Sequence, residues 1–269
     1  MVRPLSIYLI CIAMLLKEEF KAKIQARQQF CFLIRTTGEV CNLGPNSWHA
    51  AKIVLAAGSP IQRLVSGKGK THLFCNQQAV LILQQDGRSI EANILGKYIE
   101  IIDRGVLWAD KGWKNLAHYL DPTCGIGLGP WPDAKFECRD YYKKALCYWQ
   151  HGNKRKALFF LGAAVHLVQD LCVPHHAKGI AFCGHQEYER WVRKNYFEFS
   201  VNKAGIYNVA SNPAGWVEIN AKIARCYFPY VTPVSSETSY RLATGTLLPL
   251  AQRSTAGFFS FFLENCQAK

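Results

Sequence analysis

Helical periodicity is the feature that most constrains the fold of this chain. From about Thr71 onward, apolar residues recur at the three- and four-residue spacing that gathers them on one face of an α-helix. The alternating pattern typical of β-strands is almost absent. The segment DPTCGIGLGPWPDAK, residues 121–135, carries the glycines and prolines of a loop. The sequence therefore predicts an all-α fold, with no linker dividing residues 71–269.

Local signals predict where several helices begin and end. Thr71 is a candidate N-cap for the first helix, and Gly87 is a candidate stop. A second helix is expected over residues 89–108. Pro174 is expected to end the long helix that precedes it, and Pro249 to kink the last one.

The charge balance points to an anionic partner without identifying it. The chain has 32 Lys and Arg against 19 Asp and Glu, which gives a formal net charge of +13. Such a basic surface suits nucleic acid or an acidic membrane. No compact basic block, P-loop, zinc-finger or RNA-binding motif is present, so charge alone does not choose between these partners.

Cysteine usage indicates free thiols. The chain has 11 cysteines, an odd number, and none form a Cys-x-x-Cys pair. This disfavours zinc ribbons and thioredoxin chemistry. Several cysteines fall in apolar helical runs, where a free thiol packs as a small hydrophobe. Buried free thiols are therefore favoured over a disulfide framework, which weighs against secretion.

The N-terminal segment suggests export. Residues 6–16, SIYLICIAMLL, form an apolar run after Arg3 that is too short to span a bilayer and resembles the core of a signal peptide. No small-x-small cleavage site follows. We therefore divide the chain into residues 1–47, a possible signal or anchor, and a folded domain over residues 48–269. We expect a secreted or cell-envelope protein.

Ionisable residues interrupt an apolar helix in a pattern that predicts a metal site. His166 and Asp170 are four residues apart and project from one helix face. His185 and Glu189 repeat this spacing, and His176 lies between the two pairs. A lone histidine on such a face is more often a hydrogen-bonded core residue. Two pairs and a third histidine instead favour zinc, whose nitrogen and oxygen ligands they can supply.

The motif AVHLVQDLCVPHHA, followed by GHQEYE, resembles the zinc-dependent phospholipase C family. That family includes bacterial phosphatidylcholine-preferring phospholipases C and clostridial alpha-toxins, and its pattern is HxxxDxxxPxHA followed by HxxxE. The matching residues are His166, Asp170, Pro174, His176, Ala177, His185 and Glu189, with Tyr188 also in its usual place.

Upstream segments extend the resemblance over roughly residues 70–265. KTHLFCNQQAVLIL aligns His72 with an early histidine ligand of the family, and GVLWADKGWKNLAHYLDP aligns Asp110 and His118 with an aspartate and a histidine ligand. The resemblance implies a single multi-helix domain with a metal cluster in a cleft between helices.

The resemblance further implies three zinc ions. The ligands fall into three sets, with Asp170 bridging the first and the third: Asp110, His118, His166 and Asp170; His176, His185 and Glu189; His72 and Asp170. In the family, an N-terminal tryptophan completes the third set through its amino group and carbonyl. The first tryptophan here is Trp48, which would become N-terminal only after cleavage following Ser47. Two of the implied zinc ions therefore have more predicted ligands than the third.

The implied activity is hydrolysis of glycerophospholipids to diacylglycerol and a phosphorylated head group. A hydroxide bridging the metals would attack phosphorus, and the metals would neutralise the developing charge. The predicted catalytic carboxylates are Asp110, Asp170 and Glu189. Lys111 either favours an anionic head group or is a solvated surface lysine. The expected protein is a monomer, with a phospholipid membrane surface as its partner.

Two alternatives stay open. S1/P1-type single-strand nucleases share the tri-zinc fold and the core motif, and a basic surface would suit nucleic acid equally well. The GHQEYE segment favours the phospholipase, because those nucleases usually present Asn-Leu-His and then Trp-Asp. The other alternative is a catalytically inactive metal-binding homologue, for which the absence of an N-terminal tryptophan is the best argument.

Overall fold

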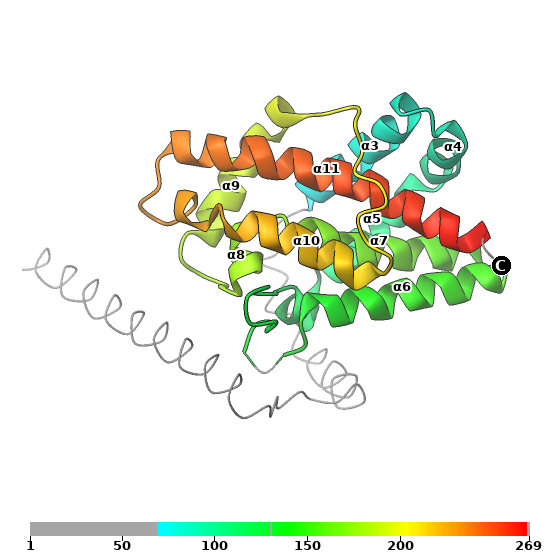
Figure 1. The fold of residues 1–269 in the computed structure, drawn as a ribbon, viewed down its shortest axis with the longest axis horizontal. Helices are drawn as coiled ribbons and strands as arrows, with labels where there is room; N and C mark the ends of the chain where they lie inside the picture. The colour runs from blue at the N-terminus through cyan, green and yellow to red at the C-terminus, as the bar shows by residue number, and fades with distance from the viewer. Residues whose placement is uncertain (1–68, 130, 268–269) are drawn as a thin grey trace, which may run out of the picture. The chain divides into compact units, whose positions relative to one another are not determined.

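The computed structural model describes residues 69–129 and 131–267, and every regular element in these ranges is helical (Figure 1). The α-helices are α3 (Lys70–Gln85), α4 (Ser89–Lys97), α5 (Ile99–Ala109), α6 (Ala134–Gln150), α7 (Lys154–Asp170), α8 (Pro174–Lys178), α9 (His185–Asn195), α10 (Pro213–Arg225) and α11 (Glu237–Gln267). Three short 3₁₀ helices are η2 (Gly112–Ala117), η3 (Tyr196–Phe199) and η4 (Phe228–Tyr230). The predicted all-α fold is confirmed for these residues.

Helix α7 is the centre of the packing. Residues 161–170 of this helix are all buried. Helices α5, α6 and α11 pack against it, and α10 lies between α6 and α11 (Figure 1). Because α7 is enclosed on every side over its last three turns, any polar group there must find a partner inside the protein. His166, Gln169 and Asp170 are such groups.

Two glycines allow α5 and α7 to approach closely. A Cβ atom on Gly105 would lie 1.9 Å from the carbonyl oxygen of Phe159, and one on Gly162 would lie 2.1 Å from that of Ile102. Both distances are far below contact distance, so only glycine fits at either position. The crossing brings the C-terminal end of α5, where Asp110 lies, towards the buried part of α7.

Helix boundaries agree with the predictions in part. Gly87, with a φ of 80°, follows α3 as expected for a stop. Thr71 is not the N-cap, since α3 begins one residue earlier and its N-cap is Gly69, in the left-handed region. The helix expected over residues 89–108 is two helices, broken at Tyr98 two residues after Gly96, whose low helix propensity weakens this stretch.

The two prolines occupy different positions in their helices. Helix α7 ends at Asp170, and Pro174 begins the short helix α8 instead of simply terminating α7. Proline is favoured in the first turn because its missing N–H would have no helical partner there. Pro249 lies inside α11, which continues from Glu237 to Gln267.

The described residues test some of the other predictions made from the sequence. The eight cysteines described there are free thiols, and Cys75, Cys138 and Cys172 are buried. None of the described helices combines the length and apolarity needed to cross a membrane. The predicted domain boundary at residues 47–48 lies outside the described ranges.

Candidate metal centre

All predicted ligands except Trp48 lie together at one end of α7. His72 is in the first turn of α3, and Asp110 directly follows α5. His118 follows η2, while His176 is on α8. A pocket of about 430 Å³ is lined by His72, Asp110, His118, Asp170, His176, His185 and Glu189. His166 is fully buried beside them. Trp48 lies outside the described residues.

The innermost group surrounds one oxygen of Asp170. His118 Nδ1 lies 2.9 Å and His166 Nε2 lies 3.1 Å from Asp170 Oδ2, and the two nitrogens are 3.2 Å apart. Ligands arranged tetrahedrally around zinc at about 2.0–2.1 Å are separated by about 3.3 Å. The three atoms thus have nearly the mutual spacing of zinc ligands. Asp110 offers an oxygen within 4.8 Å of these two histidines.

A second group forms around Glu189 on α9. His185 Nε2 lies 2.9 Å from Glu189 Oε1, and His176 Nε2 lies 3.9 Å from the same oxygen. The Nδ1–H of His176 donates to the carbonyl of His118 at 2.8 Å, and that of His185 to the carbonyl of Ala181 at 3.4 Å. These backbone bonds leave both Nε2 atoms for the pocket.

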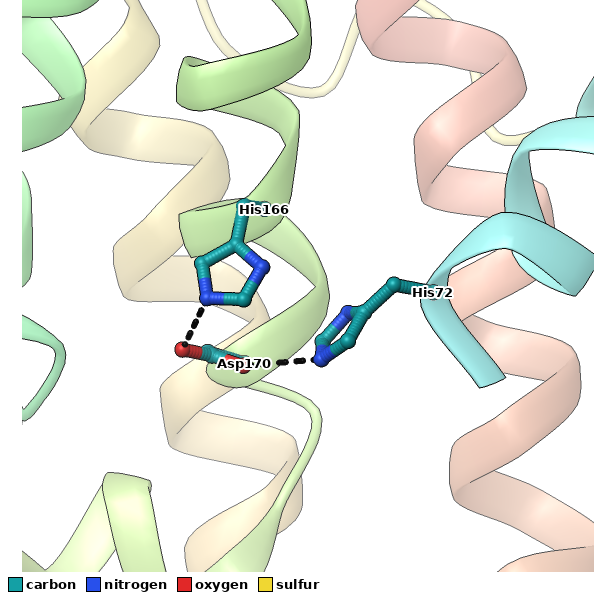
Figure 2. A group of neighbouring side chains, drawn as sticks. All are labelled: His72, His166 and Asp170. Carbon is teal, nitrogen blue, oxygen red and sulfur yellow. Dashed lines mark ion pairs between the residues drawn. The ribbon is translucent and has the colours of Figure 1, made fainter. Parts of the chain in front are cut away.

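His72 approaches Asp170 from the other side. Its Nε2 atom lies 3.4 Å from Asp170 Oδ1, whereas His166 lies against Oδ2. Figure 2 shows the two imidazoles on different helices with the carboxylate between them. The two oxygens of Asp170 therefore face different histidines, as a bridging carboxylate would require.

Burial and mutual charge set the protonation of these groups. Burial disfavours the charged form of Asp170, yet the imidazoles of His166 and His176 hold the pKa of this carboxyl well below its usual range. Burial opposes ionisation of Glu189 too, but the hydrogen bond and charge of His185 lower its pKa to about 2. Both side chains are therefore carboxylates at neutral pH.

The pKa values of the imidazoles and of Asp110 are shifted in different directions. Burial lowers the pKa of His118, and that of His176 to about 4, so both rings are neutral and available as ligands. The pKa of His166 is raised, because the charge of Asp170 outweighs burial. Burial raises the pKa of Asp110, and a nearby cation would favour its ionised form.

The residues present fit zinc. Five imidazoles and three carboxylates make up the site, and zinc commonly takes nitrogen and oxygen ligands of these types. His185 Nε2 is buried and faces the Glu189 carboxylate at 2.9 Å. Ring nitrogens that face carboxylates around one pocket are an arrangement that a bound cation would stabilise.

Two aromatic side chains that are not predicted ligands, Tyr119 and His175, stack on the ligands. The Tyr119 ring stacks on His176, with centroids 4.5 Å apart and an interplanar angle of 10°. His175 is buried, stacks on His185 at 4.8 Å, and its Nε2–H donates to the carbonyl of Cys183 at 3.1 Å. Each residue is adjacent in sequence to a ligand, and that proximity was the available signal.

Comparison with known proteins decides which family this site belongs to. A sequence profile described as zinc dependent phospholipase C matches residues 71–228. The chain belongs to this family. The matched range includes every predicted ligand that the structure describes.

Several curated members of the family are similar to the chain. A phospholipase C of Listeria monocytogenes is 24% identical over 71% of this chain and 76% of its own length. A phospholipase C of Clostridium perfringens is 24% identical over 75% of this chain and 60% of its own length. One from Paraclostridium bifermentans is 30% identical over 55% of this chain and 44% of its own length. The chain thus spans less than two thirds of these clostridial relatives.

Solved structures show the same fold. The alpha toxin from Clostridium absonum superposes with a TM-score of 0.66 at 22% identity, covering 74% of this chain and 64% of that chain. The Clostridium perfringens alpha-toxin of an avian strain gives a TM-score of 0.63 at 20% identity, with the same coverage. The predicted family and helical architecture are confirmed.

Proposed function

We propose that the chain is a zinc-dependent phospholipase C that hydrolyses glycerophospholipids to diacylglycerol and a phosphorylated head group. The observation that carries this proposal is the convergence of five imidazoles and three carboxylates at one pocket, in a chain that belongs to the family. The named relatives are phospholipases C, which favours lipid over nucleic acid as substrate.

The proposed ligands form the three sets predicted from the sequence. Asp110, His118, His166 and Asp170 would hold one ion; His176, His185 and Glu189 a second; His72 and Asp170 a third. When bound, zinc lowers the pKa of water and polarises phosphoryl oxygens. N-terminal sequencing of the mature protein tests the third set, because only a chain beginning at Trp48 could add an amino group to it.

The chain's own carboxylates orient the site. Asp170 directs one oxygen towards His72 and the other towards His118 and His166, which supports its role as the bridge. Asp110 and Glu189 both line the pocket, where a bound phosphodiester would meet them. We propose these three as the catalytic carboxylates, with the leaving alkoxide taking its proton from a water that Asp110 or Glu189 would orient.

The pocket mouth suits a bilayer. Phe182 lines the pocket although 78% of its surface is exposed, so an apolar ring stands where lipid would enter. Lys70 and Arg193 also line the pocket and would attract anionic lipid head groups. Lys111, the cation considered from sequence, is exposed and lies outside this lining. Secretion or envelope attachment and the monomeric state stay predictions.

A side-by-side assay tests the proposal. Purified protein would be supplied with zinc and offered phosphatidylcholine, phosphatidylethanolamine, phosphatidylglycerol and single-stranded DNA. We expect diacylglycerol release that disappears in His166→Ala and Asp170→Asn. The matched controls are His151→Ala and Asp140→Asn, which alter the same residue types outside the metal centre. DNA cleavage without lipid hydrolysis would favour the nuclease, and zinc binding without either activity would favour the inactive homologue.

A further inference from the structure

A network of hydrogen-bonded polar side chains begins at His72. Its Nδ1 atom lies 2.8 Å from Gln169 Oε1. Gln169 Nε2 donates to Asn76 Oδ1 at 2.9 Å and to Thr255 Oγ1 at 3.1 Å, and Asn76 Nδ2 donates to Asp103 Oδ1 at 2.7 Å. The two amides and the threonine are buried. Helices α3, α5, α7 and α11 each contribute to this network, although none of its members except His72 is a predicted ligand.

The carboxylate at one end fixes the direction of the bonds. An ionised Asp103 only accepts hydrogen bonds, so Asn76 must turn its amide nitrogen towards it and its oxygen away. That oxygen receives an N–H from Gln169, whose own oxygen is then left to accept from His72. His72 Nδ1 must therefore carry the proton.

We propose that Asp103, Asn76 and Gln169 form a relay that sets the tautomer of His72, with the proton on Nδ1 and the lone pair on Nε2. Nε2 is the atom that faces Asp170 Oδ1. The three members of the relay are positioning residues, because they act on the metal centre through His72. That His72 binds zinc rests on the proposed function, whereas the tautomer itself does not.

His72 depends on side chains for a bond that other ligands make to the backbone. His176 and His185 donate their Nδ1–H groups to main-chain carbonyls, which no substitution removes. The corresponding acceptor for His72 belongs to Gln169 and can be deleted. Without it, a neutral His72 would satisfy Asp170 Oδ1 by carrying its proton on Nε2, and that nitrogen would lose the lone pair a metal needs.

Nitrogen-15 NMR of histidine-labelled, zinc-free protein tests the tautomer. Spectra at about pH 9, above the usual titration range of imidazole, would identify the His72 signal by its absence in His72→Gln. We expect protonated Nδ1 in the wild type. Gln169→Met, which keeps similar volume but lacks the acceptor, should move the proton to Nε2. Asp103→Asn, which keeps the shape but can both donate and accept, should give a mixture of tautomers.

Zinc competition against a chelator measures the consequence. Removing an outer partner of a ligating histidine typically lowers metal affinity about 10–100-fold, and we expect that loss for one zinc ion in Gln169→Met. Glu100→Gln, an exposed carboxylate on the same helix as Asp103, is the matched control and should bind like the wild type. Thermal melting confirms that each variant is folded.

The outcomes separate this inference from the proposed function. Wild-type His72 with its proton on Nε2, or a Gln169→Met variant that keeps both the wild-type tautomer and zinc affinity, would overturn the relay even if the protein hydrolyses lipid. Conversely, a wild type that binds no zinc but shows the Nδ1–H form would leave the relay standing and refute the proposed function.

Discussion

Asp170 lies at the middle of the candidate metal centre. It lies in the buried part of α7, yet histidines from four different segments lie within 4 Å of its two oxygens. Burying this carboxylate alone would be costly, so the surrounding imidazoles, and a cation when present, stabilise it. The sequence identifies Asp170 and its ligand partners through residue spacing. It does not identify the acceptor for His72, because Gln169 comes close only through the packing of α3 on α7.

The metal-free protein should lose stability as pH falls from about 6.5 to about 4. The pKa of His175 is lowered to about 3 and that of His176 to about 4, in both cases chiefly by burial. Below about pH 6.5, these two imidazoles therefore bind protons in the unfolded chain but stay neutral in the folded state. Each such group lowers the free energy of unfolding by up to about 1.4 kcal/mol per pH unit in this window.

The raised pKa of His166 and His185 does not cancel this effect. Their contribution is fully present below about 6.5 and is lost only as pH rises through their folded values. Urea unfolding of zinc-free protein at pH 7 and pH 4.5 checks the sign. An unfolding free energy that is equal or larger at pH 4.5 would contradict the burial of neutral imidazoles.

At the scale of helices, the crossing of α5 and α7 positions the site. Gly105 and Gly162 let the backbones touch, and the crossing carries Asp110 to the pocket. The sequence gives the helices but not this contact, since a lone glycine in a helical pattern indicates only low propensity. The break between α4 and α5 was likewise not predicted, because no proline marks it. Pro174 was predicted only as the end of the preceding helix. In the structure it also begins α8, the helix that contains His176.

Gly162→Ala should destabilise the protein and weaken the metal centre together. The added methyl group would lie 2.1 Å from the Ile102 carbonyl oxygen, so the two helices must separate. Overpacking of this kind typically costs about 1–3 kcal/mol. Urea unfolding and zinc titration measure the two effects.

Gly96→Ala is the matched control for that substitution. Its added methyl would meet only Val80 Cγ1, at 3.7 Å, which is an ordinary contact. Because alanine has the higher helix propensity, this variant should be neutral or gain up to about 1 kcal/mol. Equal stability of Gly162→Ala and the wild type would show that the close crossing is not required.

At the scale of the whole molecule, the fold and the family follow from motifs, whereas the substrate-facing surface does not. The ligand motifs identify the family, and the family implies the helical architecture that the structure has. The positions of Phe182, Lys70 and Arg193 in the pocket lining could not be predicted, because these residues come from separate segments and belong to no motif. The proposed third zinc set would also need Trp48, which lies outside the described residues.

Phe182→Ser should weaken binding to phospholipid vesicles while leaving hydrolysis of a soluble, short-chain phospholipid nearly unchanged. Burying a phenylalanine ring is worth about 1.5–3 kcal/mol, so its loss at the interface should cost on the order of tenfold or more in vesicle affinity. Vesicle sedimentation gives the affinity. Ile90→Ser, similarly exposed but on α4 outside the pocket lining, is the control and should bind vesicles like the wild type.

The most direct test of the central claim is diacylglycerol release before and after zinc is removed. The purified protein would be assayed on mixed phospholipid vesicles, stripped with a chelator, assayed again, and then resupplied with zinc. We predict hydrolysis that vanishes with the metal and returns with it, with little recovery when magnesium is added instead, because imidazole ligands favour zinc over magnesium. Hydrolysis that persists in the zinc-free protein, or a zinc-loaded protein that releases no diacylglycerol, would contradict the account.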